Sequence, residues 1–190
     1  MDYLLDLLQG LGIAAAIGIR PFLPVLLVGA LAGANLGVDF DGTDFGFLEQ
    51  FGFLLAILVG VAALGIVERR AAQRVSLAVG AVSLVLGALL AAGSIADHSD
   101  TWWPGVPIGV AAASLGFLAA RSLFERVRAR LDREAANALP LFAEGAALAA
   151  AGFSVLFPPL ALVVVAALVW LLVGGRRRAG EKYAGLRILR

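Results

Sequence analysis

The stretch GLGIAAAIGIRPFLPVLLVGALAG, residues 10–33, decides how this chain folds. It is apolar throughout except for Arg20, which Pro21 and Pro24 follow. About 20 apolar residues suffice for a helix to cross the hydrocarbon core of a bilayer, and a proline breaks a helix because it lacks the backbone N–H. The stretch therefore predicts a membrane helix that is broken at Arg20-Pro21. We expect it to cross the bilayer; the alternative is a re-entrant hairpin, which would leave the N-terminus outside the cell.

The composition of the whole chain indicates a membrane protein as well. Of the 190 residues, 61% are hydrophobic and 15% are charged, against about 45–50% and about 25% in soluble domains. The mean hydropathy is +0.94. A chain with so few charges cannot cover a water-soluble body, which excludes a soluble enzyme. The absence of cysteine excludes disulfides and thiolate chemistry, and the single histidine, His98, excludes a multi-histidine metal site.

Further apolar runs follow, and none of them alternates apolar with polar residues as the strands of a membrane barrel do. Pro158-Pro159 divides the apolar stretch 139–175 and predicts a tight hairpin there. The halves 1–95 and 105–176 then hold three crossings each, which suggests a 3+3 inverted repeat like that of many transporters. The predicted fold is an all-α bundle of six transmembrane helices in a single transmembrane domain, residues 1–190, with helices at about 10–33, 51–67, 75–95, 105–124, 139–156 and 160–175 and a cytoplasmic tail at 176–190.

The charged residues predict the orientation of this bundle. Connections 34–50 and 96–104 hold acidic residues and no lysine or arginine, whereas fourteen of the fifteen basic residues lie in segments 68–74, 121–138 and 176–190. Basic connections of membrane proteins face the cytoplasm. Six crossings with this pattern place both the N-terminus and the C-terminus in the cytoplasm.

Arg20 is the leading candidate for a binding residue, because an arginine at the centre of a membrane helix costs at least about 2.5–3.5 kcal/mol. Many transporters bind an anionic group beside a broken helix such as the one at Pro21 and Pro24, and a guanidinium matches phosphate or carboxylate with two hydrogen bonds. Glu144, in the fifth predicted helix, lies about 8 Å closer to the cytoplasmic side than Arg20 does. Two long side chains can bridge this gap, so Glu144 is the expected charge partner or proton carrier. Glu68 ends the second predicted helix and is a further candidate for the pathway. The alternative is an Arg20–Glu144 ion pair that only ties helices together.

Two polar segments outside the predicted spans carry weaker patterns. Residues 121–136 predict an amphipathic extension of the fourth helix, whose arginines from Arg121 to Arg133 suit an anionic lipid surface or only set the orientation. The sequence Asp-His-Ser-Asp at 97–100 could hold a cation, although a solvated loop is the better explanation of it. The aspartates at 39–44 lack the glutamate at the twelfth position of an EF-hand, so we predict no metal site.

The residues GIAAAIGIRPFLPVLL at 12–27 resemble the opening of a bacterial family of small integral-membrane proteins that is catalogued as domain of unknown function 4126. The resemblance continues through Glu68, GALLAA at 87–92, LPLFAE at 139–144 and the arginine-rich tail, and it departs from the family pattern at Arg69-Arg70. It implies a multi-pass protein of the bacterial cytoplasmic (inner) membrane and no particular activity. Over a shorter stretch, Arg20-Pro21 and the following helix are similar to the broken-helix motif of bacterial lipid-carrier transporters of the DedA type.

These observations predict a small transporter or flippase-like protein for an anionic solute or lipid headgroup, with Arg20 as the anion contact. The alternative function is a non-transporting membrane scaffold or assembly factor. We expect no enzymatic activity, no cofactor and no nucleic-acid partner, because the sequence holds no nucleotide fingerprint and the predicted spans hold no histidine. The expected partners are the lipid bilayer, anionic lipid at the basic segment and a second copy of the chain in a homo-oligomer.

Overall fold

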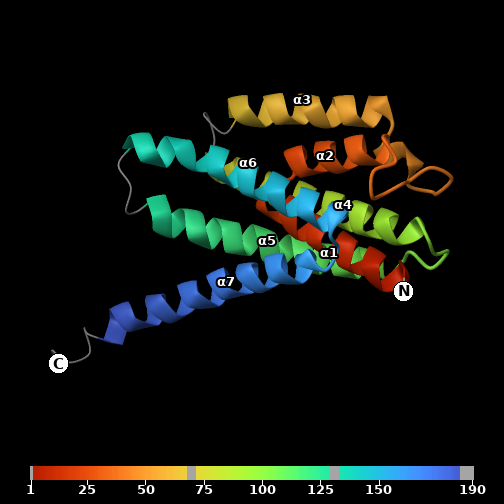
Figure 1. Ribbon diagram of the computed structural model, residues 1–190. Coiled ribbons are helices and arrows are strands. Elements are labelled where there is room, and N and C mark those ends of the chain that lie inside the picture. The colour runs from red at the N-terminus through yellow and green to blue at the C-terminus, as the bar shows by residue number, and fades with distance from the viewer. Residues whose placement is uncertain (1, 68–71, 129–132, 185–190) are drawn as a thin grey trace.

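The computed structural model describes the backbone of residues 2–67, 72–128 and 133–184, and the side chains of residues 3–63, 77–127 and 138–174. Within these ranges the protein contains helices and no strand (Figure 1), which confirms the predicted all-α class. The elements are α1 (Asp2–Ile19), α2 (Phe22–Ala32), the short 3₁₀ helix η1 (Gly46–Leu48), α3 (Phe51–Val67), α4 (Ala72–Ala96), α5 (Gly105–Arg128), α6 (Arg133–Leu156) and α7 (Leu160–Ala184).

The first apolar segment forms two helices, and the predicted break at Arg20-Pro21 is confirmed. The N–H of Arg20 donates to the carbonyl of Ala16 at 3.2 Å and completes the last turn of α1. Pro21 has no N–H and disfavours helical backbone at the residue before it, so α1 ends at Ile19. Pro24 is tolerated because it lies in the first turn of α2, where backbone N–H groups have no partner within the helix.

The two helices fold back on each other as a re-entrant hairpin, so the expected crossing of residues 10–33 is wrong. In α1 the side-chain amide of Gln9 donates to the carbonyl of Gly37, just beyond α2, at 2.5 Å. The start of α1 and the end of α2 therefore lie at the same end of the molecule. A hydropathy pattern measures the length of an apolar run but not its direction, and a run of this length suits either arrangement.

The hairpin also changes the predicted position of the N-terminus. Asp6 lies 3.3 Å from His98, which follows α4. The beginning of α1 is thus at the end of the bundle that carries connections 33–50 and 97–104, which we call the acidic end (Figure 1). From the acidic end α7 runs to the opposite one, which we call the basic end because Arg121 and Arg126 lie towards it in the last turns of α5 (Figure 1). The start of α1 and the end of α7 therefore lie at opposite ends of the bundle, which differs from the predicted arrangement with both on one side.

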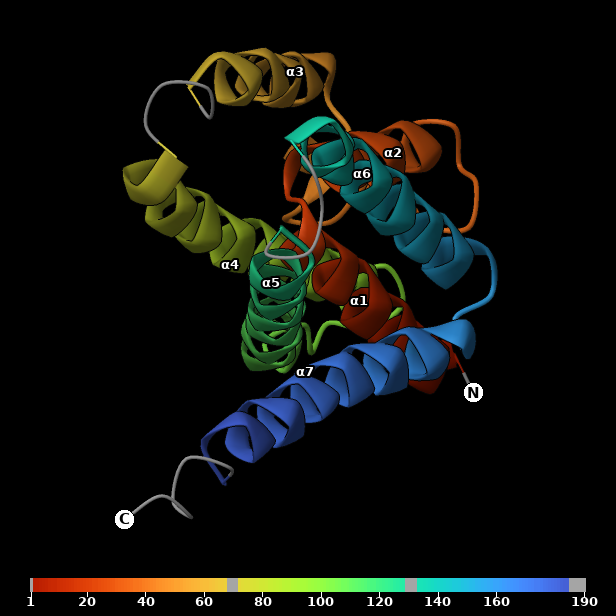
Figure 2. The same ribbon diagram turned by 90° about the vertical axis from the view of Figure 1, so that its left-hand side faces the viewer.

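Helix α1 is the centre of the bundle (Figure 2), because α4, α5, α6 and α7 all pack against it. Glycines on different faces of α1 allow this close packing. A Cβ added at Gly10 would lie 3.0 Å from the Ala91 backbone of α4, and one at Gly12 would lie 2.6 Å from the Ala161 side chain of α7. At Gly18 it would overlap the backbone of Ala113 in α5. Small residues therefore let four neighbouring helices surround a single buried one.

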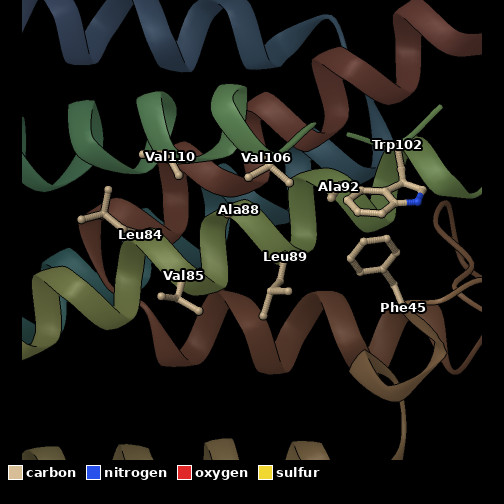
Figure 3. Close-up of a pocket in the computed structure, with 9 residues that line it drawn as sticks. All are labelled: Phe45, Leu84, Val85, Ala88, Leu89, Ala92, Trp102, Val106 and Val110. Carbon is tan, nitrogen blue, oxygen red and sulfur yellow. The ribbon is translucent and has the colours of Figure 1, made fainter. Parts of the chain in front are cut away.

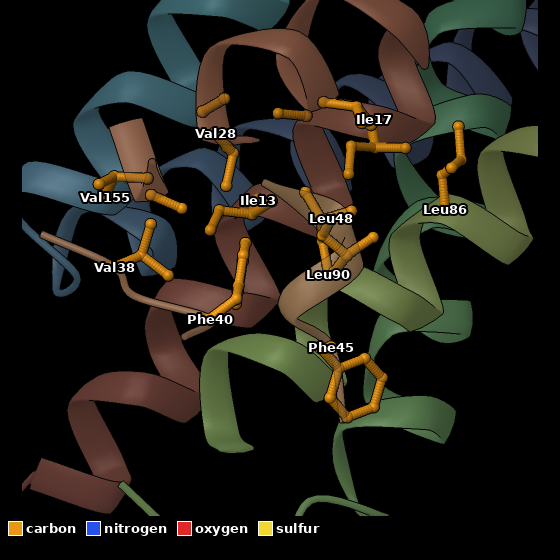
Figure 4. Close-up of a cluster of buried hydrophobic side chains, with 14 of the residues drawn as sticks. Ile13, Ile17, Val28, Val38, Phe40, Phe45, Leu48, Leu86, Leu90 and Val155 are labelled. Atoms are coloured by element: carbon orange, nitrogen blue, oxygen red, sulfur yellow. The ribbon is translucent and has the colours of Figure 1, made fainter. Parts of the chain in front are cut away.

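Connection 33–50 is acidic in composition, but its apolar residues close the acidic end of the hairpin. Phe40 and Leu48 are 0% and 1% exposed, and they lie beside Ile13 and Leu90 in a buried cluster (Figure 4). Gly93 of α4 makes room for the Phe40 ring, which would lie 3.0 Å from an added Cβ. This connection is therefore part of the core as well as a link between helices.

The later helices follow the prediction more closely. α3 has the predicted bounds, and α6 and α7 are joined at the Pro158-Pro159 turn, as expected. α5 covers residues 121–128 of the predicted extension of the fourth helix, whereas residues 133–136 belong to α6 and residues 129–132 lie outside the described part of the chain.

Three described helices are long and apolar enough to cross a membrane: Leu77–Ala96, Gly105–Val127 and Ala138–Leu156. Shorter apolar helices occupy Tyr3–Ile19, Phe22–Ala32, Phe51–Ala63 and Leu160–Gly174. The six-helix bundle and the 3+3 repeat are not confirmed, because the described part of the chain has four α-helices before connection 97–104 and three after it.

Candidate functional site

Arg20 and Glu144, which the sequence predicted as partners, face each other across α1 and α6. The Nε atom of Arg20 lies 3.6 Å from Oε1 of Glu144. The Arg20 side chain is 10% exposed and the Glu144 side chain is 25% exposed. The guanidinium is therefore enclosed, while the carboxylate keeps partial access to the surroundings of the bundle.

The antiparallel packing of α1 on α6 sets the depth of this pair. Gln9 also donates to the carbonyl of Val155 at 3.2 Å. Arg20 lies eleven residues after Gln9, and its partner Glu144 lies eleven residues before Val155, so both are the same distance further from the acidic end. Eleven residues of α-helix are about 17 Å long. The ion pair thus lies at the tip of the hairpin, well inside the bundle.

Both prolines of the predicted site lie in the same place. Pro21 forms the link between α1 and α2, and Pro24 lies one turn into α2. Their side chains are less than 2% exposed. Phe22, between them, packs its ring on Gly60 of α3, where an added Cβ would lie 2.9 Å from the ring. The structure therefore brings Arg20, both prolines and Glu144 together, whereas Glu68, the remaining predicted residue, lies outside the described residues.

A polar cluster at the acidic end was not predicted. Asp6, Gln9 and Ser94 are 6%, 3% and 0% exposed. The Ser94 hydroxyl lies within hydrogen-bond distance of Oε1 of Gln9 (2.9 Å) and of the carbonyl of Asp6 (3.2 Å). The available signal was the spacing of Asp6 and Gln9, three residues apart among leucines, which places both on one face of a helix. This cluster joins the start of α1 to the end of α4.

His98 belongs to the same cluster and not to a cation site with Asp100. Its Nδ1 atom lies 3.3 Å from Oδ2 of Asp6 and 3.5 Å from Oδ2 of Asp97. Both carboxylates approach the same ring nitrogen, an arrangement of polar contacts to one atom rather than of ligands that converge on a metal ion. Among the described residues there is no group of histidine and acidic side chains that is placed to hold a metal ion.

The acidic residues of connection 33–50 interact mainly with each other and with the backbone. Partial burial raises the pKa of Glu49 above its ordinary value, and the charges of Asp41 and Asp39 add to the rise. The N–H of Phe40, which donates to Oε2 of Glu49 at 3.4 Å, opposes it. These carboxylates make the acidic end strongly negative.

The two arginines of the basic segment whose side chains the structure describes are engaged within the protein. Nε of Arg121 lies 3.0 Å from Oε1 of Glu125, one turn further along α5. Nη2 of Arg126 donates to the carbonyl of Leu171 at 3.2 Å and ties α5 to α7. The side chains of Arg128, Arg130 and Arg133 lie outside the described residues.

Comparison of this chain with protein-family models, with curated proteins and with solved structures finds no match. The resemblance to the family of domain of unknown function 4126 therefore stays a prediction.

Proposed function

We propose that this chain is a multi-pass protein of the bacterial inner membrane whose acidic end faces the periplasm and whose basic end faces the cytoplasm. The three long apolar helices support membrane insertion. The peripheral helices also carry large exposed apolar side chains, among them Leu58 on α3, Phe142 on α6 and Val163 on α7. In water these surfaces would be an aggregation hazard, whereas in a bilayer they face lipid. The separation of charge between the two ends supports the orientation.

Within this membrane protein we propose an anion site at Arg20, in a small transporter or flippase-like protein for an anionic solute or lipid headgroup. The observation that carries the proposal is a guanidinium held at the tip of a re-entrant hairpin, opposite a partly exposed glutamate. The pair lies about 17 Å from the acidic end, close to the middle of a hydrocarbon core of about 30 Å. Ionisable residues at such depth are costly and mark ligand or ion pathways in membrane proteins.

The ligand approaches Arg20 from the basic end. Connection 33–50 and the cluster around Phe40 fill the acidic side of the hairpin. On the other side α1 and α2 stop at the hairpin tip, while α6 begins eleven residues before Glu144. We therefore expect a cytoplasmic anion or the headgroup of an inner-leaflet lipid to reach the guanidinium from this less filled side. Glu144 is the charge partner with which this anion competes for the guanidinium, or the proton carrier of the site.

The competing function is a scaffold in which the ion pair only fixes α1 against α6, and the low exposure of Arg20 favours it. The Arg20→Lys variant separates the two. Lysine keeps the charge but cannot form the paired hydrogen bonds of a guanidinium with phosphate or carboxylate. An anion site should then lose affinity for phosphatidylglycerol in nanodiscs, or for inorganic phosphate in detergent, by at least roughly tenfold, or about 1.4 kcal/mol.

The exposed arginine at position 121 provides the matched control for this experiment. Arg121→Lys changes the same chemistry on the surface of α5, where the side chain is 51% exposed, and should leave both affinities unchanged. Thermal unfolding of each variant shows whether it has folded. A folded Arg20→Lys protein that binds both ligands as tightly as the parent contradicts the anion site and supports the scaffold.

A further inference from the structure

An apolar groove lies on the surface of the bundle between α4 and α5, away from α6 and the Arg20 site. Its volume is about 360 Å³, and every residue that lines it is apolar. Figure 3 shows Leu84 and Val110 towards one end, Ala88 and Val106 along its middle, and Phe45 and Trp102 at the other end.

The shape of the groove follows from the spacing of small and large side chains on α4. Leu84, Ala88 and Ala92 are four residues apart and share one face of the helix, over about 12 Å of its length. The alanine side chains are too short to fill the space between α4 and α5. At the acidic end the rings of Phe45 and Trp102 meet edge to face, with centroids 5.3 Å apart, and line that end of the groove.

We propose that this groove holds one acyl chain of a phospholipid from the leaflet at the acidic end. The proposal rests on the membrane placement proposed above but not on the anion site at Arg20. The two walls belong to helices that are long and apolar enough to cross a bilayer, so the groove opens towards hydrocarbon. Its volume lies near the lower limit of small-molecule sites, about 300–1,000 Å³. A slender hydrocarbon chain fits such a narrow groove without loss of any polar contact.

The charge around the acidic end of the groove favours one kind of headgroup for this lipid. Trp102 lies in connection 97–104, after Asp97 and Asp100. Phe45 lies in connection 33–50, which holds Asp39, Asp41 and Glu49. Neither connection has a lysine or an arginine. A headgroup with an ammonium group, such as that of phosphatidylethanolamine, complements this negative field. A purely anionic headgroup such as phosphatidylglycerol meets only like charge there.

Photo-crosslinking of the full chain in nanodiscs tests the proposal. The probes are phosphatidylethanolamine and phosphatidylglycerol that carry the same photoreactive acyl chain. Ala88→Trp and Val106→Trp each fill the groove from a different helix, so that one of them remains informative if the other does not fold. Val163→Trp adds the same side chain to an exposed position of α7, outside the groove.

We expect the ethanolamine probe to label the α4 and α5 peptides several-fold more than the glycerol probe, and either groove-filling variant to lower this labelling about tenfold. The Val163→Trp protein should be labelled as the parent is. If the groove variants were labelled as strongly as the control, the lipid would be a non-specific boundary lipid and the proposal would be overturned. If both probes labelled the protein equally, the choice of headgroup would be overturned. If the Ala88→Cys variant formed a disulfide-linked dimer, the occupant of the groove would be a second copy of the chain, which would also overturn the proposal.

These outcomes can be told apart from failure of the proposed function. Loss of the anion site would leave the labelling of α4 and α5 unchanged. Failure of the chain to float with lipid vesicles would overturn both the membrane placement and the groove proposal.

Discussion

Replacement of Glu144 by alanine should lower the free energy of unfolding by about 3–5 kcal/mol, the usual cost when one partner of a buried ion pair is removed. The Arg20 side chain is only 10% exposed, so the variant would leave its charge without this close partner in a site that has little access to water. Glu144→Gln keeps the size and the hydrogen-bond acceptor, so its loss should be smaller. Thermal or denaturant unfolding of the purified protein in detergent measures both values.

The exposed ion pair on α5 provides the control for this prediction. Glu125 and Arg121 are 66% and 51% exposed, and a surface pair of this kind contributes about 0.2–1 kcal/mol. Glu125→Ala should therefore have little effect. If Glu144→Ala destabilised the protein no more than Glu125→Ala does, the Arg20–Glu144 pair would not be a buried interaction, and the hairpin tip would be misplaced.

A double substitution separates the structural from the functional contribution of the pair. Arg20→Met together with Glu144→Leu exchanges two buried charges for apolar side chains of similar length. Such exchanges are often neutral or stabilising, so the double variant should recover most of the stability that Glu144→Ala loses. It should nevertheless bind neither phosphatidylglycerol nor phosphate if the pair forms the anion site.

Gly18→Ala should destabilise the protein by about 3 kcal/mol, at the upper end of the range for overpacked cores. A Cβ at Gly18 would overlap the backbone carbonyl of Ala113 in α5. A backbone atom cannot move aside by changing a rotamer, so the two helices must separate. Gly116→Ala should act in the same way from the other helix, because its Cβ would overlap the carbonyl of Ala15 in α1.

Gly145 in α6 offers the matched control, because a Cβ added there meets no atom within 4 Å. In an open helical position alanine is favoured over glycine by roughly 0.5–1 kcal/mol. The same substitution should therefore stabilise the protein at Gly145 and destabilise it at Gly18. Equal effects at the two positions would mean that α1 and α5 do not pack backbone to backbone.

The fold could be predicted from the sequence where a local signal has a single physical meaning. The bounds of α3 follow from an uncharged apolar run between Gln50 and Glu68, and the turn between α6 and α7 follows from Pro158-Pro159. The break at Arg20-Pro21 was predicted for the same reason. The fold-back of α2 onto α1 that follows this break was not predicted, because a proline ends a helix without determining whether the next helix continues onward or returns.

The candidate site could be predicted in part. Arg20 and Glu144 were paired from their depths along two helices, and the structure brings them within 3.6 Å. The cluster of Asp6, Gln9 and Ser94 was missed because it exists only when α1 starts at the acidic end. A chain that crossed the bilayer at residues 10–33 would have placed these side chains at opposite ends of the bundle. One error in topology therefore concealed a whole set of contacts.

The re-entrant hairpin is the central claim, and cysteine accessibility in intact bacterial cells tests it directly. The chain has no cysteine, so a single cysteine at Tyr3, at Trp103 or at Ala184 is the only reactive thiol. A membrane-impermeant maleimide should label Tyr3→Cys and Trp103→Cys in intact cells, and Ala184→Cys only after the cells are opened. If Tyr3→Cys, like Ala184→Cys, were labelled only after the cells are opened, positions 3 and 184 would lie on the same side of the membrane. That result would contradict the hairpin.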